Sequence, residues 1–179
     1  DQLRQQRLER QIRMGLIDKK WQLSDRADVA WDSLSPKKKK EMDLRMAYYA
    51  AMVDRMDQNI GKLVEHLRTS GELDNTLILF LSDNGACQEG GKLGGKNDPF
   101  DVDEWEKTYG AGPSYGMVWA NASNTPFRKF KHFTHEGGLS TPLIVHWPEK
   151  ISRTGVFYGE PAYLVDIMPT IIDVADARY

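Results

Sequence analysis

The segment TLILFL, residues 76–81, is the feature that most constrains the fold. It is a continuous apolar run of strand length that ends abruptly in Ser82, Asp83, Asn84 and Gly85. Because successive side chains of a strand point to opposite faces, a run without polar alternation predicts a strand that is apolar on both faces. Such strands belong to parallel or mixed sheets that helices cover on both sides. The run therefore predicts an α/β fold.

Helices and a second strand are predicted around this run. Apolar residues spaced about four apart indicate a helix within residues 1–20. Ser35 is followed by a proline and can cap a helix with its hydroxyl group, so a long amphipathic helix is expected from there to Gly71. The apolar run at 141–148 predicts another strand, and the pattern over 165–177 predicts a last helix.

Asp83 and Asn84 are candidate metal ligands. In open α/β sheets ligands bind beyond the carboxyl ends of strands, and these two residues follow the predicted strand directly. Their carboxylate and amide oxygens are hard donors suited to Ca²⁺ or Mg²⁺, and Gly85 lets the backbone turn sharply behind them. Two ligands are not a complete site, because Ca²⁺ takes six or more oxygens. The residues alone leave a metal site and a plain strand-ending turn both open.

A second candidate site is the basic loop NTPFRKFKHFTHEGG, residues 124–138. It lies in a stretch, 85–141, without sustained periodicity, and so long an irregular segment in a compact protein is usually functional. Lys131 could neutralise the charge of a sulfate or phosphate group, whereas a solvated surface loop is the alternative. His132 and His135 do not have the spacing of zinc ligands on a helix.

Charge and hydropathy indicate neither a nucleic-acid partner nor a membrane span. The 24 Lys and Arg against 26 Asp and Glu give a net charge of -2, so we expect no nucleic-acid partner. No apolar run approaches the roughly 20 residues that span a bilayer. Cys87, the one cysteine, cannot form an intramolecular disulfide and is interpreted as a small half-buried residue. The triplet at Asn121 matches a glycosylation acceptor, a pattern that is common by chance.

Four successive segments resemble the type I sulfatases, the arylsulfatase branch of the alkaline phosphatase superfamily. The match runs from about residue 36 to 175 and is densest over 74–148. The resemblance implies that residues 36–179 are the C-terminal part of a sulfatase catalytic domain, preceded by a helical and loop segment over 1–35. It also implies an alkaline-phosphatase-like sandwich, a mixed sheet covered by helices, that is incomplete in this chain. The segments are YYAAMVDRMDQNIGKLVEHL, GELDNTLILFLSDNGA, SYGMVWANASNTPFRKFKHFTHEGGLSTPLIVHWP and YLVDIMPTIIDVA.

The resemblance joins the two candidate sites. In that family calcium is held by an acidic pair near the N-terminus and by an Asp-Asn pair that closes a core strand, which here matches Asp83 and Asn84. A lysine before the family's Glu-Gly-Gly turn contacts the sulfate group, and it matches Lys131, which precedes Glu136. Calcium is therefore expected in preference to magnesium. The histidines beside the lysine receive no role from the resemblance.

The family's nucleophile does not match any residue of this chain. It is a formylglycine made from the Cys or Ser of a Cys/Ser-x-Pro-x-Arg motif, and Cys87 is followed by neither the proline nor the arginine. The N-terminal acidic pair is missing as well. We therefore expect a C-terminal portion that is inactive alone, and whose apolar strands need neighbours from the N-terminal half of the same protein.

The intact enzyme is expected to hydrolyse an organic sulfate ester to an alcohol and sulfate. The resemblance implies that hydrated formylglycine attacks sulfur while calcium and Lys131 offset charge on the sulfate oxygens. The expected substrate is a small-molecule or carbohydrate sulfate ester. Two alternatives stay open: a phosphodiesterase or phosphonate monoester hydrolase of the same superfamily, and a non-catalytic relic or interaction module. The compartment stays open too, with periplasmic, secreted and cytoplasmic locations all allowed.

Overall fold

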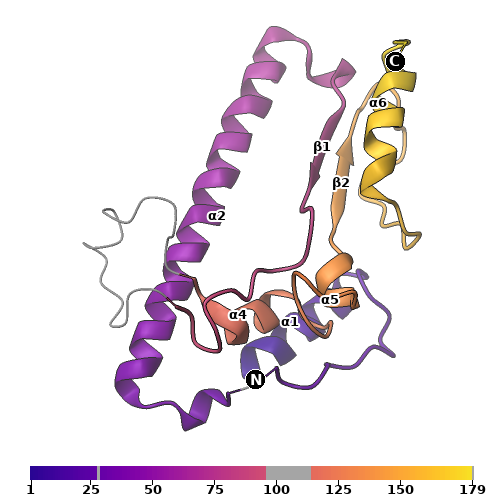
Figure 1. Ribbon diagram of the computed structural model, residues 1–179. Helices are drawn as coiled ribbons and strands as arrows, with labels where there is room; N and C mark the ends of the chain where they lie inside the picture. The colour runs from indigo at the N-terminus through magenta and orange to yellow at the C-terminus, as the bar shows by residue number, and fades with distance from the viewer. Residues whose placement is uncertain (28, 96–113, 179) are drawn as a thin grey trace.

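The computed structural model describes residues 1–27, 29–95 and 114–178 and shows a mixed α/β arrangement dominated by one long helix. Two strands run beside that helix but stay apart from it along most of their length (Figure 1). The helices are α1 (Gln2–Arg13), α2 (Pro36–Ser70), α4 (Gly116–Ser123), α5 (Glu136–Leu139) and α6 (Ile167–Val174), and the strands are β1 (Ile78–Leu81) and β2 (Leu143–His146). Short 3-10 turns occupy Trp31–Ser33, Leu73–Asn75 and Leu164–Asp166.

Helix α2 begins and ends where its capping residues predict. The Ser35 hydroxyl accepts a hydrogen bond from the backbone N–H of Lys38 at 3.3 Å, and Pro36 takes the first helical position. At the other end Gly71 adopts a left-handed conformation with φ of 77°, which glycine tolerates without a side-chain clash. Although α2 is 35 residues long, no helix in the described ranges has the length and apolarity needed to cross a membrane.

The two predicted strands are confirmed, and they pair with each other. The ladder is antiparallel, with Ile78 opposite His146 and Leu81 opposite Leu143. A mixed sheet also needs a parallel pair, and the part of the chain that the structure describes contains only this two-stranded sheet. Strand β2 is exposed along its whole length and Phe80 of β1 is 40% exposed. The expected mixed sheet with helices on both faces is therefore only partly present, because the described chain supplies no further strand beside this pair.

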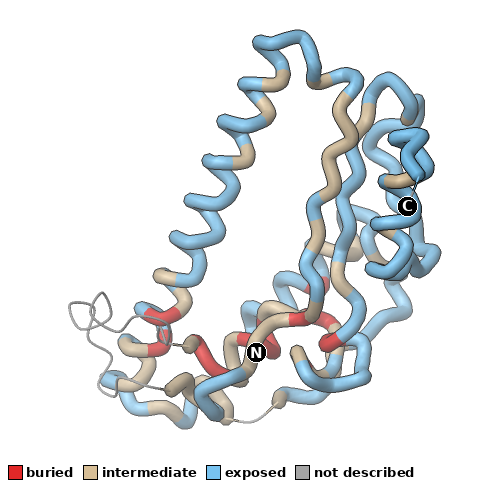
Figure 2. The backbone as a smooth tube through the Cα atoms, turned by 45° about the horizontal axis from the view of Figure 1, so that its top comes forward, coloured by how far each residue is buried: buried red, intermediate tan, exposed pale blue. Residues whose placement is uncertain are grey.

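The buried core lies at one end of the molecule, where α1, α4 and the N-terminal part of α2 meet (Figure 2). Tyr115, Ala120 and Phe130 form its centre, and Met42 of α2 is fully buried. Aromatic contacts hold the loop that follows α1 in place. Trp21 packs edge-on against Phe127 at 5.6 Å, and Trp31 packs against Trp119 at 5.5 Å, both measured between ring centroids. The core therefore holds the N-terminal loop against α4.

Among the described helices of eight residues or more, α4 alone is not predicted by the residue pattern. Its buried positions are glycine, alanine and asparagine, so its inner face carries no periodic row of large apolar residues. Asn121 is only 2% exposed, and its side-chain oxygen accepts a hydrogen bond from the backbone of Ala27 at 3.4 Å. The asparagine of the glycosylation-like triplet is thus a core residue in this fold.

Replacing Met42 with alanine is expected to lower the free energy of unfolding of the 179-residue chain by roughly 2–5 kcal/mol, because it empties space in the core. Met52 lies on the same helix and is 52% exposed, whereas Met42 is 0% exposed. Met52→Ala is therefore the matched control and should change stability by less than about 0.5 kcal/mol. Urea unfolding followed by tryptophan fluorescence measures both, and equal losses would contradict the position of the core.

Candidate functional site

Strand β1 delivers Asp83 and Asn84 just beyond its carboxyl end. Asp83 is exposed and Asn84 is half-buried. The Asn84 side-chain NH₂ donates to the carbonyl oxygen of Gly85 at 3.0 Å, and the Ser82 hydroxyl donates to the Asn84 carbonyl oxygen at 2.8 Å. The amide donor is used within the turn. Oδ1 of Asn84 and the Asp83 carboxylate make no hydrogen bond or ion pair with the described residues. Both oxygens are left as acceptors.

Gly85 locks this turn against the Glu-Gly-Gly segment. Its N–H donates to the carbonyl oxygen of Gly138 at 3.0 Å, and a Cβ added to Gly85 would lie 1.7 Å from the Gly137 carbonyl oxygen. The sequence predicts glycine here for a sharp turn. The structure gives a different reason, because two backbones approach too closely for any side chain.

The Lys131 loop is bonded directly to the same turn. The backbone N–H of Lys131 donates to the carbonyl oxygen of Ala86 at 3.1 Å. Its neighbours Lys129 and His132 both adopt left-handed conformations, with φ of 70° and 78°. Lys131 itself is half-buried. The structure therefore brings the two segments that carry the predicted site residues into one hydrogen-bonded unit, here called the site junction, residues 83–86 and 128–138.

Asn124 ties the site junction together and is a residue that sequence reasoning missed. Its side-chain oxygen accepts from the N–H of Ala86 at 3.0 Å, and its NH₂ donates to the carbonyl oxygens of Lys129 at 3.0 Å and Gly137 at 2.7 Å. One side chain thus satisfies three backbone groups from both halves of the junction. Nothing around Asn124 in the sequence distinguishes it from an ordinary turn asparagine.

Glu89 places a negative charge beside the basic loop. Its Oε1 lies 3.1 Å from Nε2 of His132 and 3.9 Å from Nζ of Lys131. Hydrogen bonds from His132 and from the half-buried Cys87, followed by the charge of Lys131, lower the pKa of the Glu89 carboxyl. Glu89 therefore stays ionised beside Lys131. His135 lies away from this contact, with Nε2 3.4 Å from the Arg128 guanidinium.

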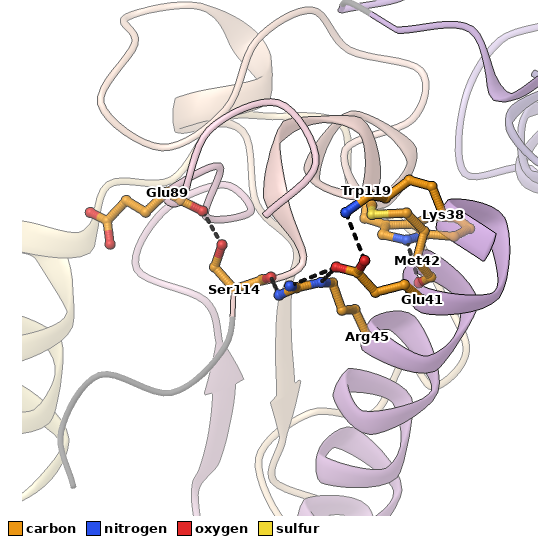
Figure 3. A network of polar contacts seen from close by, with 7 residues as sticks. All are labelled: Lys38, Glu41, Met42, Arg45, Glu89, Ser114 and Trp119. Carbon is orange, nitrogen blue, oxygen red and sulfur yellow. Dashed lines mark hydrogen bonds and ion pairs between the residues drawn. The ribbon is translucent and has the colours of Figure 1, made fainter. Parts of the chain in front are cut away.

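A buried arginine connects the site to α2 (Figure 3). Arg45, 3% exposed, donates two hydrogen bonds to Glu41 Oε1, from Nε at 3.0 Å and from Nη2 at 2.8 Å. Its Nη1 donates to the carbonyl oxygen of Ser114 at 2.9 Å, and the Ser114 hydroxyl donates to the carbonyl oxygen of Glu89. This series of contacts fixes the backbone of Glu89 relative to the long helix.

The oxygens on the turn fit part of a calcium site. Asp83 and Asn84 supply one charged and one neutral oxygen, the ligand types that Ca²⁺ accepts, from an exposed and a half-buried residue. Ca²⁺ takes six to eight oxygens, so these two residues make up a fraction of its coordination shell. In the described ranges no three His, Cys, Asp or Glu side chains are grouped as a metal site.

Residues 17–177 match the family model described as sulfatase. The chain belongs to the sulfatase family. An uncharacterized sulfatase of Schizosaccharomyces pombe is 36% identical over 191 residues, which cover 100% of this chain and 34% of that protein. The arylsulfatase of Klebsiella aerogenes is 34% identical over 83% of this chain and 33% of its own length. The mouse steryl-sulfatase is 30% identical over 73% of this chain and 17% of its own length.

These matches confirm the resemblance to sulfatases that the sequence motifs indicate. The chain spans about a third of the length of the first two relatives, from Schizosaccharomyces pombe and Klebsiella aerogenes, and less of the mouse protein. Asp83, Asn84 and Lys131 all lie inside the matched region.

Asn124→Asp tests whether Asn124 holds the site junction together. The change is nearly isosteric, but it removes the NH₂ donor and places a carboxylate oxygen against the carbonyl groups of Lys129 and Gly137. We expect unfolding free energy to fall by roughly 2–4 kcal/mol, because two hydrogen bonds are lost and acceptors face each other. Asn59→Asp on the exposed surface of α2 is the control, with an expected change below about 0.5 kcal/mol in the same urea titration.

Proposed function

We propose that the protein to which this chain belongs hydrolyses organic sulfate esters to an alcohol and sulfate. The carrying observation is that the Asp83-Asn84 turn and the Lys131 loop form one unit in a chain of the sulfatase family, joined by the Lys131–Ala86 and Gly85–Gly138 backbone bonds. Family membership supports a sulfate ester hydrolase, and the arylsulfatase of Klebsiella aerogenes is one of the matching relatives.

Lys131 is proposed to bind the sulfate group through its ammonium group. Negative charge spreads over the sulfate oxygens as the ester bond to sulfur breaks, and a fixed cation stabilises that charge. The loop holds the lysine by its backbone, so the side chain remains available for this contact. Half burial strengthens the interaction relative to a fully solvated lysine, because the surrounding medium screens the charge less.

Asp83 and Asn84 are proposed as two ligands of a calcium ion. Calcium suits them better than magnesium because it accepts many oxygens, including neutral carbonyl groups, in irregular geometry. When bound, calcium would supply positive charge that offsets the charge of the sulfate oxygens. The hydrogen bond from Asn84 to Gly85 holds the amide so that Oδ1 is the free acceptor. The turn therefore has its acceptors oriented before any ion arrives.

The remaining parts of the active site are proposed to come from the N-terminal part of the same protein. That part would contribute a formylglycine nucleophile and the other calcium ligands, so this chain alone is expected to be inactive. The apolar residues exposed on the strands support the proposal, since a sheet of this kind is covered in a complete domain. Phe80, Leu143, Ile144 and Val145 would then pack inside an alkaline-phosphatase-like sandwich.

In the full-length protein, Lys131→Met is expected to lower kcat for an aryl sulfate such as 4-nitrophenyl sulfate by roughly 10²–10³-fold, the usual loss when one stabilising group is removed. Lys37→Met, at the exposed start of α2, is the matched control and should leave kcat unchanged. A wild-type protein that hydrolyses a phosphate diester or phosphonate ester but no sulfate ester belongs to the alternative enzyme class. One that hydrolyses none of them is a relic or an interaction module.

Asp83→Asn is expected to weaken Ca²⁺ binding to the full-length protein by at least about tenfold, because it removes the charged ligand and keeps the size of the side chain. Isothermal titration calorimetry with calcium chloride measures this affinity. Asp57→Asn, on the exposed surface of α2, removes an equal charge away from the turn and should leave the affinity unchanged. Equal Ca²⁺ affinity of Asp83→Asn and wild type would contradict the proposed ligand.

A further inference from the structure

Glu89 makes the ionic contact with the side chain that the proposed function places on the sulfate. Its carboxylate lies between Lys131, at 3.9 Å, and His132, at 3.1 Å, and its own side chain is 58% exposed. The distance to Lys131 corresponds to an ion pair rather than a close hydrogen bond. A lysine ammonium has three N–H donors, so this contact leaves donors for an anion.

The backbone of Glu89 is held by close packing. Its carbonyl oxygen accepts from the Ser114 hydroxyl, and Ser114 is anchored to the buried Arg45 of α2. Gly90 follows with φ of 90°, and a Cβ there would lie 2.1 Å from Ser114 Oγ and 2.5 Å from the Gly95 nitrogen. Figure 3 shows the Glu89 carboxylate pointing away from these anchoring contacts. The backbone that carries the Glu89 carboxylate is therefore held in a fixed position.

The basic loop that contacts this carboxylate also has an unusual backbone conformation. His132 has a φ of 78°, a conformation that residues other than glycine adopt at a cost, and Lys129 has a φ of 70°. The contact between Glu89 and the loop therefore joins two segments that are each held by their own hydrogen bonds. An exposed ion pair adds little stability, so its effect lies in geometry and local charge.

We propose that Glu89 is a positioning residue for Lys131, holding its ammonium group in place and partly offsetting its charge, so that the bound oxyanion is aligned for turnover and still released as product. The inference rests on the proposed function, because it assigns Lys131 to the oxyanion. The proposal predicts how the charge of Glu89 affects anion binding. A carboxylate near an anion site weakens anion binding, so its removal must strengthen that binding.

Two variants of the full-length protein separate the effect of the charge of Glu89 from the effect of its side-chain length. Glu89→Gln removes the charge at nearly constant size, and it is expected to bind inorganic sulfate about threefold more tightly. Two charges 4 Å apart in water would give roughly fivefold, and an anion on the far side of Lys131 Nζ lies farther from Glu89 than the 3.9 Å to Nζ itself. The kcat of Glu89→Gln should fall about tenfold because Lys131 loses its alignment. Glu89→Asp keeps the charge and shortens the side chain, so sulfate affinity should stay within about twofold of wild type while kcat still falls.

Glu149→Gln is the matched control, because Glu149 is another exposed carboxylate paired with a lysine, Lys150, at 3.3 Å. It should change neither sulfate affinity nor kcat. Sulfate affinity is measured by calorimetry and as competitive inhibition, and kcat with 4-nitrophenyl sulfate. A purely structural role for Glu89 would lower thermal stability and weaken sulfate binding together, which is opposite in sign to the expected result and overturns the proposal.

The binding readout also distinguishes this inference from the proposed function. If wild type turns over sulfate esters and Glu89→Gln changes neither kcat nor sulfate affinity, the inference fails and the function stands. If wild type binds sulfate but hydrolyses no sulfate ester, the function fails, and tighter sulfate binding by Glu89→Gln still supports the role of Glu89 at Lys131. Failure of wild type both to bind sulfate and to hydrolyse any sulfate ester overturns both.

Discussion

The site depends on one contact between backbones. Gly85 donates to the Gly138 carbonyl oxygen, and the space beside it is too small for any Cβ because of Gly137. This contact holds the end of β1 against the basic loop without using a functional side chain. The side chains of Asp83, Asn84 and Lys131 take no part in this backbone contact, and Asn124 supplies partners for backbone groups of both segments.

The site junction lies between a packed end and an open end of the molecule. On one side Ala86 packs against the core around Tyr115 and Phe130, and burial raises the pKa of Tyr115 to about 12. On the other side β2 is exposed along its whole length, and Phe80 of the half-buried β1 is exposed as well (Figure 2). The functional residues thus take their position from the packed end, whereas the strands offer a surface for the rest of the proposed domain.

Local patterns in the sequence predict the elements that local physics determines. The caps Ser35 and Gly71 mark the ends of α2, and the apolar runs mark both strands, because these signals depend on neighbouring residues. Helix α4 escapes prediction since its buried face is made of small residues. Asn124 and Glu89 are not predicted for another reason. They contact residues as far as 38 and 43 positions away in the chain, and no residue pattern encodes which loops will cross.

The left-handed conformations of Lys129 and His132 depend on correct folding of the site junction. Each costs roughly 1–2 kcal/mol for a residue other than glycine, so an undocked loop would relax to ordinary backbone angles and carry Lys131 with it. The contacts of Asn124 and of the glycine pair hold the loop in its strained shape. Lys131 is consequently held in this position only by a completely folded junction, and a partly folded chain would not place its ammonium group here.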